Sequence, residues 1–147
     1  MSESLVDKAY PPLPAYVVGR EKVREFARAT FATDPAHTDP DAAAARGVRD
    51  VLAPATFPVV IQQAALDMLV ADPDAGIDFS RVVHGDQRFD YHRDVVAGDE
   101  LTATLRVAKV QSLGGHTMVT AEVAMSDQAG LPVVTATSTL VIRGDDH

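Results

Sequence analysis

The sequence lacks several features that define large classes of protein. It contains no cysteine, which excludes disulfide bonds and thiol chemistry. Its 13 lysines and arginines face 21 aspartates and glutamates, and this acidic balance disfavours nucleic acid, because phosphate binding needs basic residues gathered on one face. No apolar run approaches the roughly 20 residues that cross a bilayer. The first ten residues include Glu3 and Asp7 and lack the apolar stretch of a signal peptide, so we expect a cytoplasmic protein.

The length of 147 residues fits one domain with one core, so residues 1–147 are expected to form a single domain. The spacing of Val23, Phe26 and Ala27 predicts an amphipathic helix over residues 20–30. Asp39-Pro40 predicts the start of a short alanine-rich helix that stops at Gly47.

Two basic and polar features of this first half have open interpretations. Arg20, Arg24 and Arg28 recur every four residues, and on a helix they form either an anion-binding patch or, more simply, a solvated face. The most apolar segment, residues 59–70, predicts a helix buried on most of its surface, interrupted by Gln62, Gln63 and Asp67. The two glutamines lie at a ligand pocket, at a dimer contact or at the helix edge.

The second half of the chain alternates apolar and polar residues with the period of strands. This alternation predicts strands over residues 81–92, 101–107, 119–125 and 134–142, with a short one at 16–18. The turns at 114–115 and 127–130 predict an antiparallel meander. A helix that is apolar nearly all round needs cover on several sides, so we expect an α+β hotdog fold, with about five antiparallel strands wrapped around the long helix. A single sheet with open edges also predicts a dimer.

Residues 26–40 read FARATFATDPAHTDP. This stretch resembles the active-site pattern F-A-x-x-S-G-D-x-N-P-[LIV]-H of the MaoC-like (R)-specific enoyl hydratases. Aligned without gaps, His37 takes the place of the catalytic histidine, and Asp34 stands in the Asn-Pro pair. Phe31 stands where the family has glycine, and Ala32 stands where it has the catalytic aspartate. The resemblance therefore implies that half of the catalytic pair is missing.

Residues 82–100, VVHGDQRFDYHRDVVAGDE, resemble the family's strand that ends in R-P-V-x-x-G-D. Asp94 replaces the proline, a loop change that we expect not to affect the chemistry. Together the matches cover residues 10–143. The chain is similar to HadA/HadC-type subunits of actinobacterial (3R)-hydroxyacyl-ACP dehydratases, and to uncharacterised actinobacterial proteins with YPP…VGRE, APxTF and VVHGDQxF signatures. Subunits of that type lack the catalytic pair and bind the acyl chain, while a HadB-type partner carries the chemistry.

The resemblance implies a dehydratase or hydratase subunit of fatty-acid metabolism. Its ligand would be an acyl thioester on acyl carrier protein or coenzyme A, and its partner a HadB-type hotdog subunit or a second copy. No cofactor is expected. A first alternative is a self-sufficient homodimeric hydratase with His37 as base and Asp34 in place of the lost carboxylate. A second is a non-catalytic acyl-thioester-binding protein. A hotdog thioesterase is disfavoured by the hydratase-like stretch.

The candidate catalytic residues are therefore His37 and Asp34, although a lone histidine can be a turn residue and Asp34 a turn cap. A metal site at Asp34, His37 and Asp39 is disfavoured, because no fourth ligand stands out and Asp39 caps a helix. For substrate binding we expect helix-terminus donors around Pro54, Thr56 and Phe57. We also expect a strand contribution at the dipeptide His84-Gly85, where glycine allows either close approach of a ligand or a simple bulge.

Overall fold

The computed structural model describes residues 5–144. The helices are α1 (Arg20–Ala29), α2 (Pro40–Ala45) and α3 (Val59–Ala71), with short 3₁₀ helices η2 (Pro35–His37) and η3 (Phe79–Arg81). The strands are β1 (Tyr16–Val17), β2 (Val82–Tyr91), β3 (Glu100–Leu113), β4 (His116–Ser126) and β5 (Pro132–Ile142). The predicted elements all form, and β3 extends well beyond its predicted end. Within residues 5–144, no helix is long and apolar enough to cross a bilayer.

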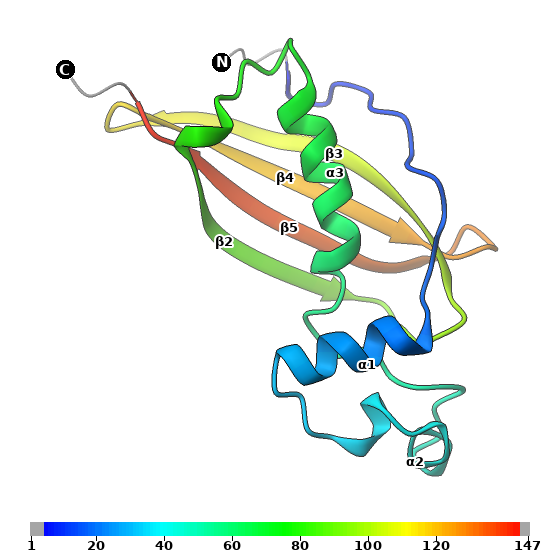
Figure 1. Cartoon of the computed structure of the whole chain (residues 1–147). Coiled ribbons are helices and arrows are strands. Elements are labelled where there is room, and N and C mark those ends of the chain that lie inside the picture. The colour runs from blue at the N-terminus through cyan, green and yellow to red at the C-terminus, as the bar shows by residue number, and fades with distance from the viewer. Residues whose placement is uncertain (1–4, 145–147) are drawn as a thin grey trace.

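The five strands form one curved antiparallel sheet in the order β1-β3-β4-β5-β2 (Figure 1). As predicted, β3, β4 and β5 are successive neighbours in a meander. β2 precedes β3 in the sequence but pairs with β5, beyond the other end of the meander. The segment between β2 and β3 therefore crosses the sheet, and β2 is left as an edge strand whose outer side has no neighbour within the described residues.

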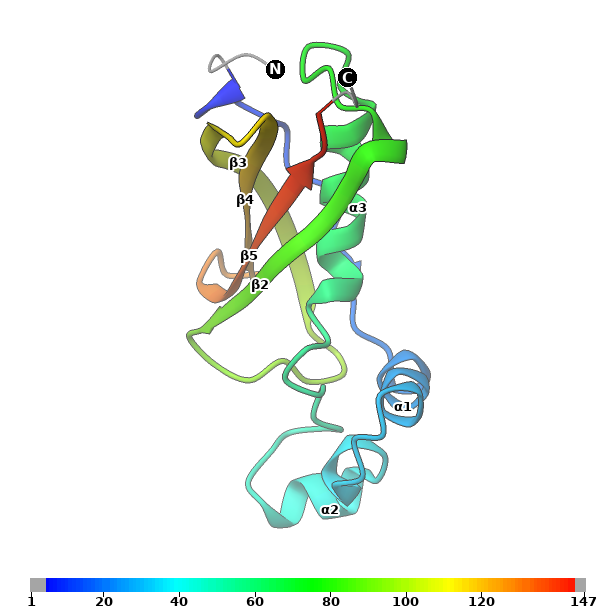
Figure 2. The same cartoon turned by 90° about the vertical axis from the view of Figure 1, so that its left-hand side faces the viewer.

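Helix α3 packs on the concave face of this sheet and completes the core. Its Ile61, Ala65 and Leu69 are buried together with inward-facing residues of the strands, such as Leu105 and Val123. The predicted hotdog fold is thus confirmed. The far side of α3 is open, because no strand or helix within residues 5–144 covers it (Figure 2).

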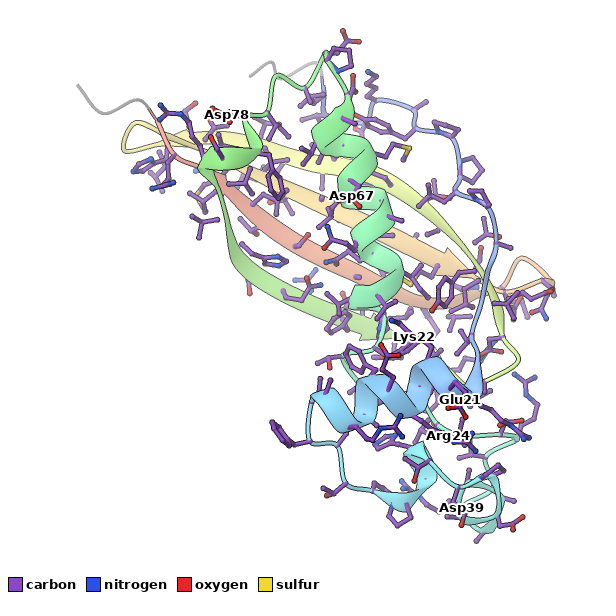
Figure 3. All side chains as sticks on the ribbon, in the orientation of Figure 1. Glu21, Lys22, Arg24, Asp39, Asp67 and Asp78 are labelled. Atoms are coloured by element: carbon purple, nitrogen blue, oxygen red, sulfur yellow. The ribbon has the colours of Figure 1, made fainter. Side chains whose placement is uncertain are left out.

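The open side of α3 carries the polar exceptions of its sequence. Gln63 and Asp67 are exposed, and Asp67 points away from the sheet (Figure 3). Gln62 differs from them, because its side chain is fully buried. The helix was predicted to be buried on most of its surface, and the structure buries the face toward the sheet while Gln63 and Asp67 stay exposed on the open side.

Helices α1 and α2 lie beyond the end of the sheet, near the N-terminal end of α3 (Figures 1 and 2). An edge-to-face contact between the rings of Phe26 and Phe57, with centroids 5.4 Å apart, joins α1 to the start of α3. Arg20 pairs with Asp50 at 2.9 Å, and Arg24 pairs with Glu21, which lies beside it on α1 (Figure 3). The arginine face is thus partly neutralised by intramolecular pairs, which favours the solvated-face interpretation.

Residues 5–14 run alongside β3, where the amides of Asp7 and Leu13 donate to the carbonyls of Val107 and Ala103, and they also contact the C-terminal end of α3. At that end, Asp72 accepts hydrogen bonds from Lys8 at 2.7 Å and from the Tyr10 hydroxyl at 2.6 Å. These two bonds lower the pKa of Asp72 to about 2. Burial and the bond to Asp72 raise the pKa of Tyr10 to about 12. The N-terminal segment is therefore tied to the helix by a carboxylate that is ionised at neutral pH.

The charge of Asp72 makes this tie depend on pH. Its folded pKa lies below the value of about 3.9 for an unfolded aspartate, so its stabilisation is present at neutral pH and is lost as the pH falls from about 4 toward 2. We expect Asp72→Asn to lower the Tm at pH 7, and the difference from wild type to shrink toward pH 2. Asp67→Asn, on the open side of α3, serves as the control. A deficit that is the same at both pH values would contradict this account.

Candidate functional site

His37 ends the short helix η2, and the local sequence fixes how its ring is held. The Asp34 carboxylate caps η2 by accepting a hydrogen bond from the Ala36 amide at 3.0 Å. The turn places Nδ1 of His37 2.6 Å from the carbonyl oxygen of Leu52. A carbonyl oxygen can only accept, so Nδ1 of the neutral ring carries the proton and Nε2 is left as an acceptor. A histidine held in this tautomer has the form required of a general base.

The segment before α3 connects this turn to the loop that follows β2. The Leu52 amide donates to the Ala36 carbonyl at 2.8 Å, and the Ala53 amide donates to the Val95 carbonyl at 2.9 Å. Residues far apart in the sequence therefore form one cleft of about 410 Å³. Its walls come from η2, the end of α2, the segment before α3, the end of β2 and the loop after it, and comprise Asp34, His37, Arg46, Leu52, Ala53, Ala55, Tyr91, Asp94 and Val95.

Tyr91, the last residue of β2, is the aromatic member of this cleft. Its hydroxyl donates to the Ala55 carbonyl at 2.6 Å, which holds the loop that leads into α3. Burial, with a smaller contribution from the charge of Asp94, raises the pKa of Tyr91 to about 12. The phenol therefore stays protonated near neutral pH.

The two carboxylates of the cleft have different surroundings. Asp34 accepts from the Ala36 amide and from Arg46, and these two bonds hold its pKa below the usual value. Asp94 makes no side-chain hydrogen bond or ion pair within residues 5–144. We expected the change from proline at this position not to affect the chemistry, yet the structure puts its carboxylate in the same cleft as His37.

The positions that align with the family's glycine and aspartate lie just before η2. Phe31 has a φ of 58°, in the left-handed region that glycine adopts most readily, and its side chain is 86% exposed. A left-handed backbone at the position that aligns with the family's glycine agrees with the gapless alignment. Ala32 lines a separate hollow of about 330 Å³, to which Asp34 also contributes. On that side the chain presents a methyl group where the family has a carboxylate.

A buried carboxylate fixes the loop that carries Asp94. The side chain of Asp99 is 1% exposed and accepts from Arg49 at 2.5 Å, from Arg93 at 3.0 Å and from the Val96 amide at 2.9 Å. Burial acts to raise its pKa, but the bonds from Arg93, Val96 and Arg49 outweigh burial and hold the pKa below its usual value. The G-D that ends the second matching stretch is therefore a structural clamp behind the cleft.

The expected residues near the start of α3 adjoin Ala53 and Ala55 of the cleft in the sequence but are not among the residues that line it. Phe57 is fully buried and Pro54 is buried, so both support the wall rather than line it. Thr56 is exposed and follows Ala55 of the cleft, and its amide has no acceptor within residues 5–144. The Phe57 amide already donates to the Pro54 carbonyl, so the Thr56 amide is the candidate for the helix-terminus donor that we predicted.

The structure places His84 and Gly85 elsewhere. His84 lines a groove of about 230 Å³ between α3 and β2. Gly85 lies at a register shift between β2 and β5, where a Cβ atom would come within 3.1 Å of the Val141 side chain. The bulge interpretation of this glycine therefore holds, and a contribution of either residue to ligand binding stays a prediction.

Sequence reasoning missed Tyr91 and Asp94 as members of the cleft. Both lie more than 50 positions after His37, and tertiary contacts such as the bond from the Ala53 amide to the Val95 carbonyl bring them to the cleft. The one available signal was the loss of the family's proline at position 94.

The curved five-stranded sheet on one long helix is the hotdog fold of the MaoC-like dehydratase type. The chain belongs to the family described as FAS1-like, dehydratase domain region, whose model matches residues 11–136. The expected resemblance is thereby confirmed.

Relatives and solved structures agree with this assignment. A UPF0336 protein of Clavibacter michiganensis is 62% identical over 146 residues, which cover 99% of this chain and 98% of that protein. A truncated HadBC (3R-hydroxyacyl-ACP dehydratase) complex of Mycobacterium tuberculosis contains a chain with 34% identity and a TM-score of 0.78, over 90% of this chain and 92% of that one. A MaoC-like dehydratase matches with 32% identity and a TM-score of 0.90, over 98% of this chain but 44% of that one.

The Asp99 clamp gives a stability prediction. In Asp99→Asn one acceptor oxygen becomes an amide donor that faces other donors, so we expect a loss of about 1–3 kcal/mol in the free energy of unfolding. The control is Asp90, an exposed aspartate that pairs with Arg88 on β2. Asp90→Asn should change the free energy of unfolding by less than about 0.5 kcal/mol. Urea unfolding measures both, and equal effects of the two substitutions would show that Asp99 is not a clamp.

Proposed function

We propose that this chain is the acyl-binding subunit of a heteromeric (3R)-hydroxyacyl-thioester dehydratase and depends on a catalytic hotdog partner. The observation that carries the proposal is the incomplete set of groups around His37. The ring is present and its tautomer is fixed, but Ala32 supplies no carboxylate and Asp34 is engaged by Arg46 and by the cap of η2. The 34% identity to a chain of the HadBC complex supports a role in a complex of the same kind.

The reaction explains why such a cleft would hold a thioester better than transform it. Dehydration removes the proton from C2, breaks the C3–O bond, moves the C2–H electron pair into the new double bond and releases the hydroxyl as water. One group must take the C2 proton and another must protonate the leaving oxygen, and each is worth about 10²–10⁴ in rate. A backbone amide beside the thioester oxygen stabilises the charge that develops there. His37 and the Thr56 amide could fill two of these roles, which leaves the third to the partner.

The edge strand β2 is the surface that we assign to the partner. Its outer side is unpaired within the described residues, and Val83 on it is 48% exposed. Phe79, the first residue of η3 before β2, is 69% exposed. An unpaired strand with apolar neighbours readily adds a further strand. Pairing with the partner's sheet here would cover this edge and also the groove beside α3.

A second candidate function, self-sufficient hydration of an enoyl thioester, is favoured by Asp94. Its carboxylate has no partner among the described residues and lines the same cleft as His37. In this alternative His37 takes a proton from water as the oxygen bonds to C3, and the carboxyl group of Asp94 carries a proton to C2, because Asp34 is engaged by Arg46 and by the cap of η2.

Activity measurements separate the two functions. We expect the purified chain to show little dehydration of a (3R)-hydroxyacyl-CoA, and a mixture with a hotdog subunit that carries the intact G-D-x-N-P-[LIV]-H pattern to be at least about 10² faster. The partner alone is the control. Full activity of the chain alone, abolished by His37→Ala, would establish the second candidate instead. Binding of the thioester without turnover in any mixture would identify a non-catalytic binding protein.

Restoring the missing carboxylate tests the assignment of Ala32. We expect Ala32→Asp to raise turnover by the chain alone by about 10²–10⁴, because the hollow at Ala32 shares Asp34 with the cleft of His37, so that a carboxylate there adds a second proton-transfer group beside the cleft. Ala44→Asp, an exposed position on α2, adds the same charge at a distance and should have no effect. No gain for Ala32→Asp in a folded protein would mean that the lost aspartate does not explain the low activity.

A further inference from the structure

The groove at His84 lies in the seam between α3 and β2, and the cleft at His37 lies at the end of this seam where β2 ends and α3 begins. β2 runs beside α3 in the opposite direction, so that its end at Tyr91 lies near the start of the helix (Figure 1). Tyr91 belongs to the cleft, and His84 to the groove. Ala55, four residues before α3 begins, belongs to the cleft, whereas Leu66, within α3, belongs to the groove. The seam thus has a hollow at each end.

A pair of glutamines spans the seam between these hollows. Gln62 of α3 donates from Nε2 to Oε1 of Gln87 at 2.8 Å, and Gln87 donates back to Oε1 of Gln62 at 2.8 Å. Gln87 lies four residues from Tyr91 and three from His84, or about 13 and 10 Å along an extended strand. On the helix, Gln62 is one turn before Leu66. The hydrogen-bonded amides of Gln62 and Gln87, which we call the bar, therefore lie across the middle of the seam between α3 and β2.

The polar character of this bar is unusual for its place in the core. Gln62 is fully buried on a helix whose other buried residues are apolar. Ser138, the cross-strand neighbour of Gln87, is 1% exposed, and its hydroxyl has no hydrogen-bond partner within the described residues. Apolar side chains of the same shape would fill this place at little or no cost in stability. The polar cluster is thus not explained by packing.

We propose that the Gln62–Gln87 pair limits the length of the acyl chain that this protein binds. With its thioester in the cleft at His37, an acyl chain extends along the seam toward the groove at His84. A short chain ends before the amide pair. A longer chain has to break both hydrogen bonds and place methylene groups against unpaired amides, which is unfavourable. This inference rests on the proposed function, because it takes an acyl thioester as the ligand of the cleft.

The binding of two saturated thioesters, butanoyl-CoA and dodecanoyl-CoA, tests the limit without turnover. The measured quantity is the ratio of their Kd values for the full chain, obtained by titration calorimetry. We expect dodecanoyl-CoA to bind wild type more weakly than butanoyl-CoA does. Gln87→Ala, which removes the bar, should lower the ratio of the dodecanoyl to the butanoyl Kd at least tenfold, mainly by tightening dodecanoyl-CoA. Gln128→Ala, in the exposed turn after β4, should leave the ratio unchanged.

A second variant covers the case in which Gln87→Ala does not fold. Gln62→Leu combined with Gln87→Leu leaves no amide unpaired and gives an apolar seam, so it should also lower the ratio. Tight butanoyl-CoA binding with an unchanged ratio in the folded variants would overturn the proposed limit while leaving the proposed function intact. The limit would also be overturned, and the proposed function left intact, if wild type bound dodecanoyl-CoA as tightly as butanoyl-CoA. If wild type binds neither thioester, the proposed function itself fails.

Discussion

The packing of α3 on one curved sheet determines most of what is distinctive in this molecule. The helix is too apolar to be exposed, yet a single sheet can cover it from one side only. Its start is positioned by the contact of Phe57 with Phe26, and its end by the bonds around Asp72. Because both ends are fixed, the hollows beside the helix have defined positions. The cleft lies where the helix begins, and the groove lies where β2 diverges from it.

The elements of the fold could be predicted from local pattern because each has a strong local cause. The alternation in residues 101–142 and the turns within it are sufficient for a meander, and the composition of residues 59–70 is sufficient for a buried helix. The position of β2 could not be predicted in this way. Its alternation is compatible with either edge of the sheet, and the choice of β5 over β3 depends on how the loop after Tyr91 crosses to β3.

The site was predictable to the extent that it depends on a contiguous motif. His37 and Asp34 lie in the matching stretch and meet in one cleft, and the left-handed backbone at Phe31 agrees with the aligned glycine. Tyr91 and Asp94 reach the same cleft through tertiary contacts, which leave no trace in spacing. The separation of Ala32 from that cleft is also a tertiary property, since two neighbouring turns direct residues 32 and 37 into different hollows.

The topology of the sheet also governs the order in which the chain can fold. β3, β4 and β5 are joined by short turns and can pair soon after each is formed, whereas β2 must wait for β5, the last strand in the sequence. Such distant pairing is slow compared with closing a hairpin, because a long loop has to be ordered first. During synthesis on the ribosome, β2 therefore emerges about 50 residues before its partner strand does, and α3 has no lasting cover on that side until the chain is almost complete.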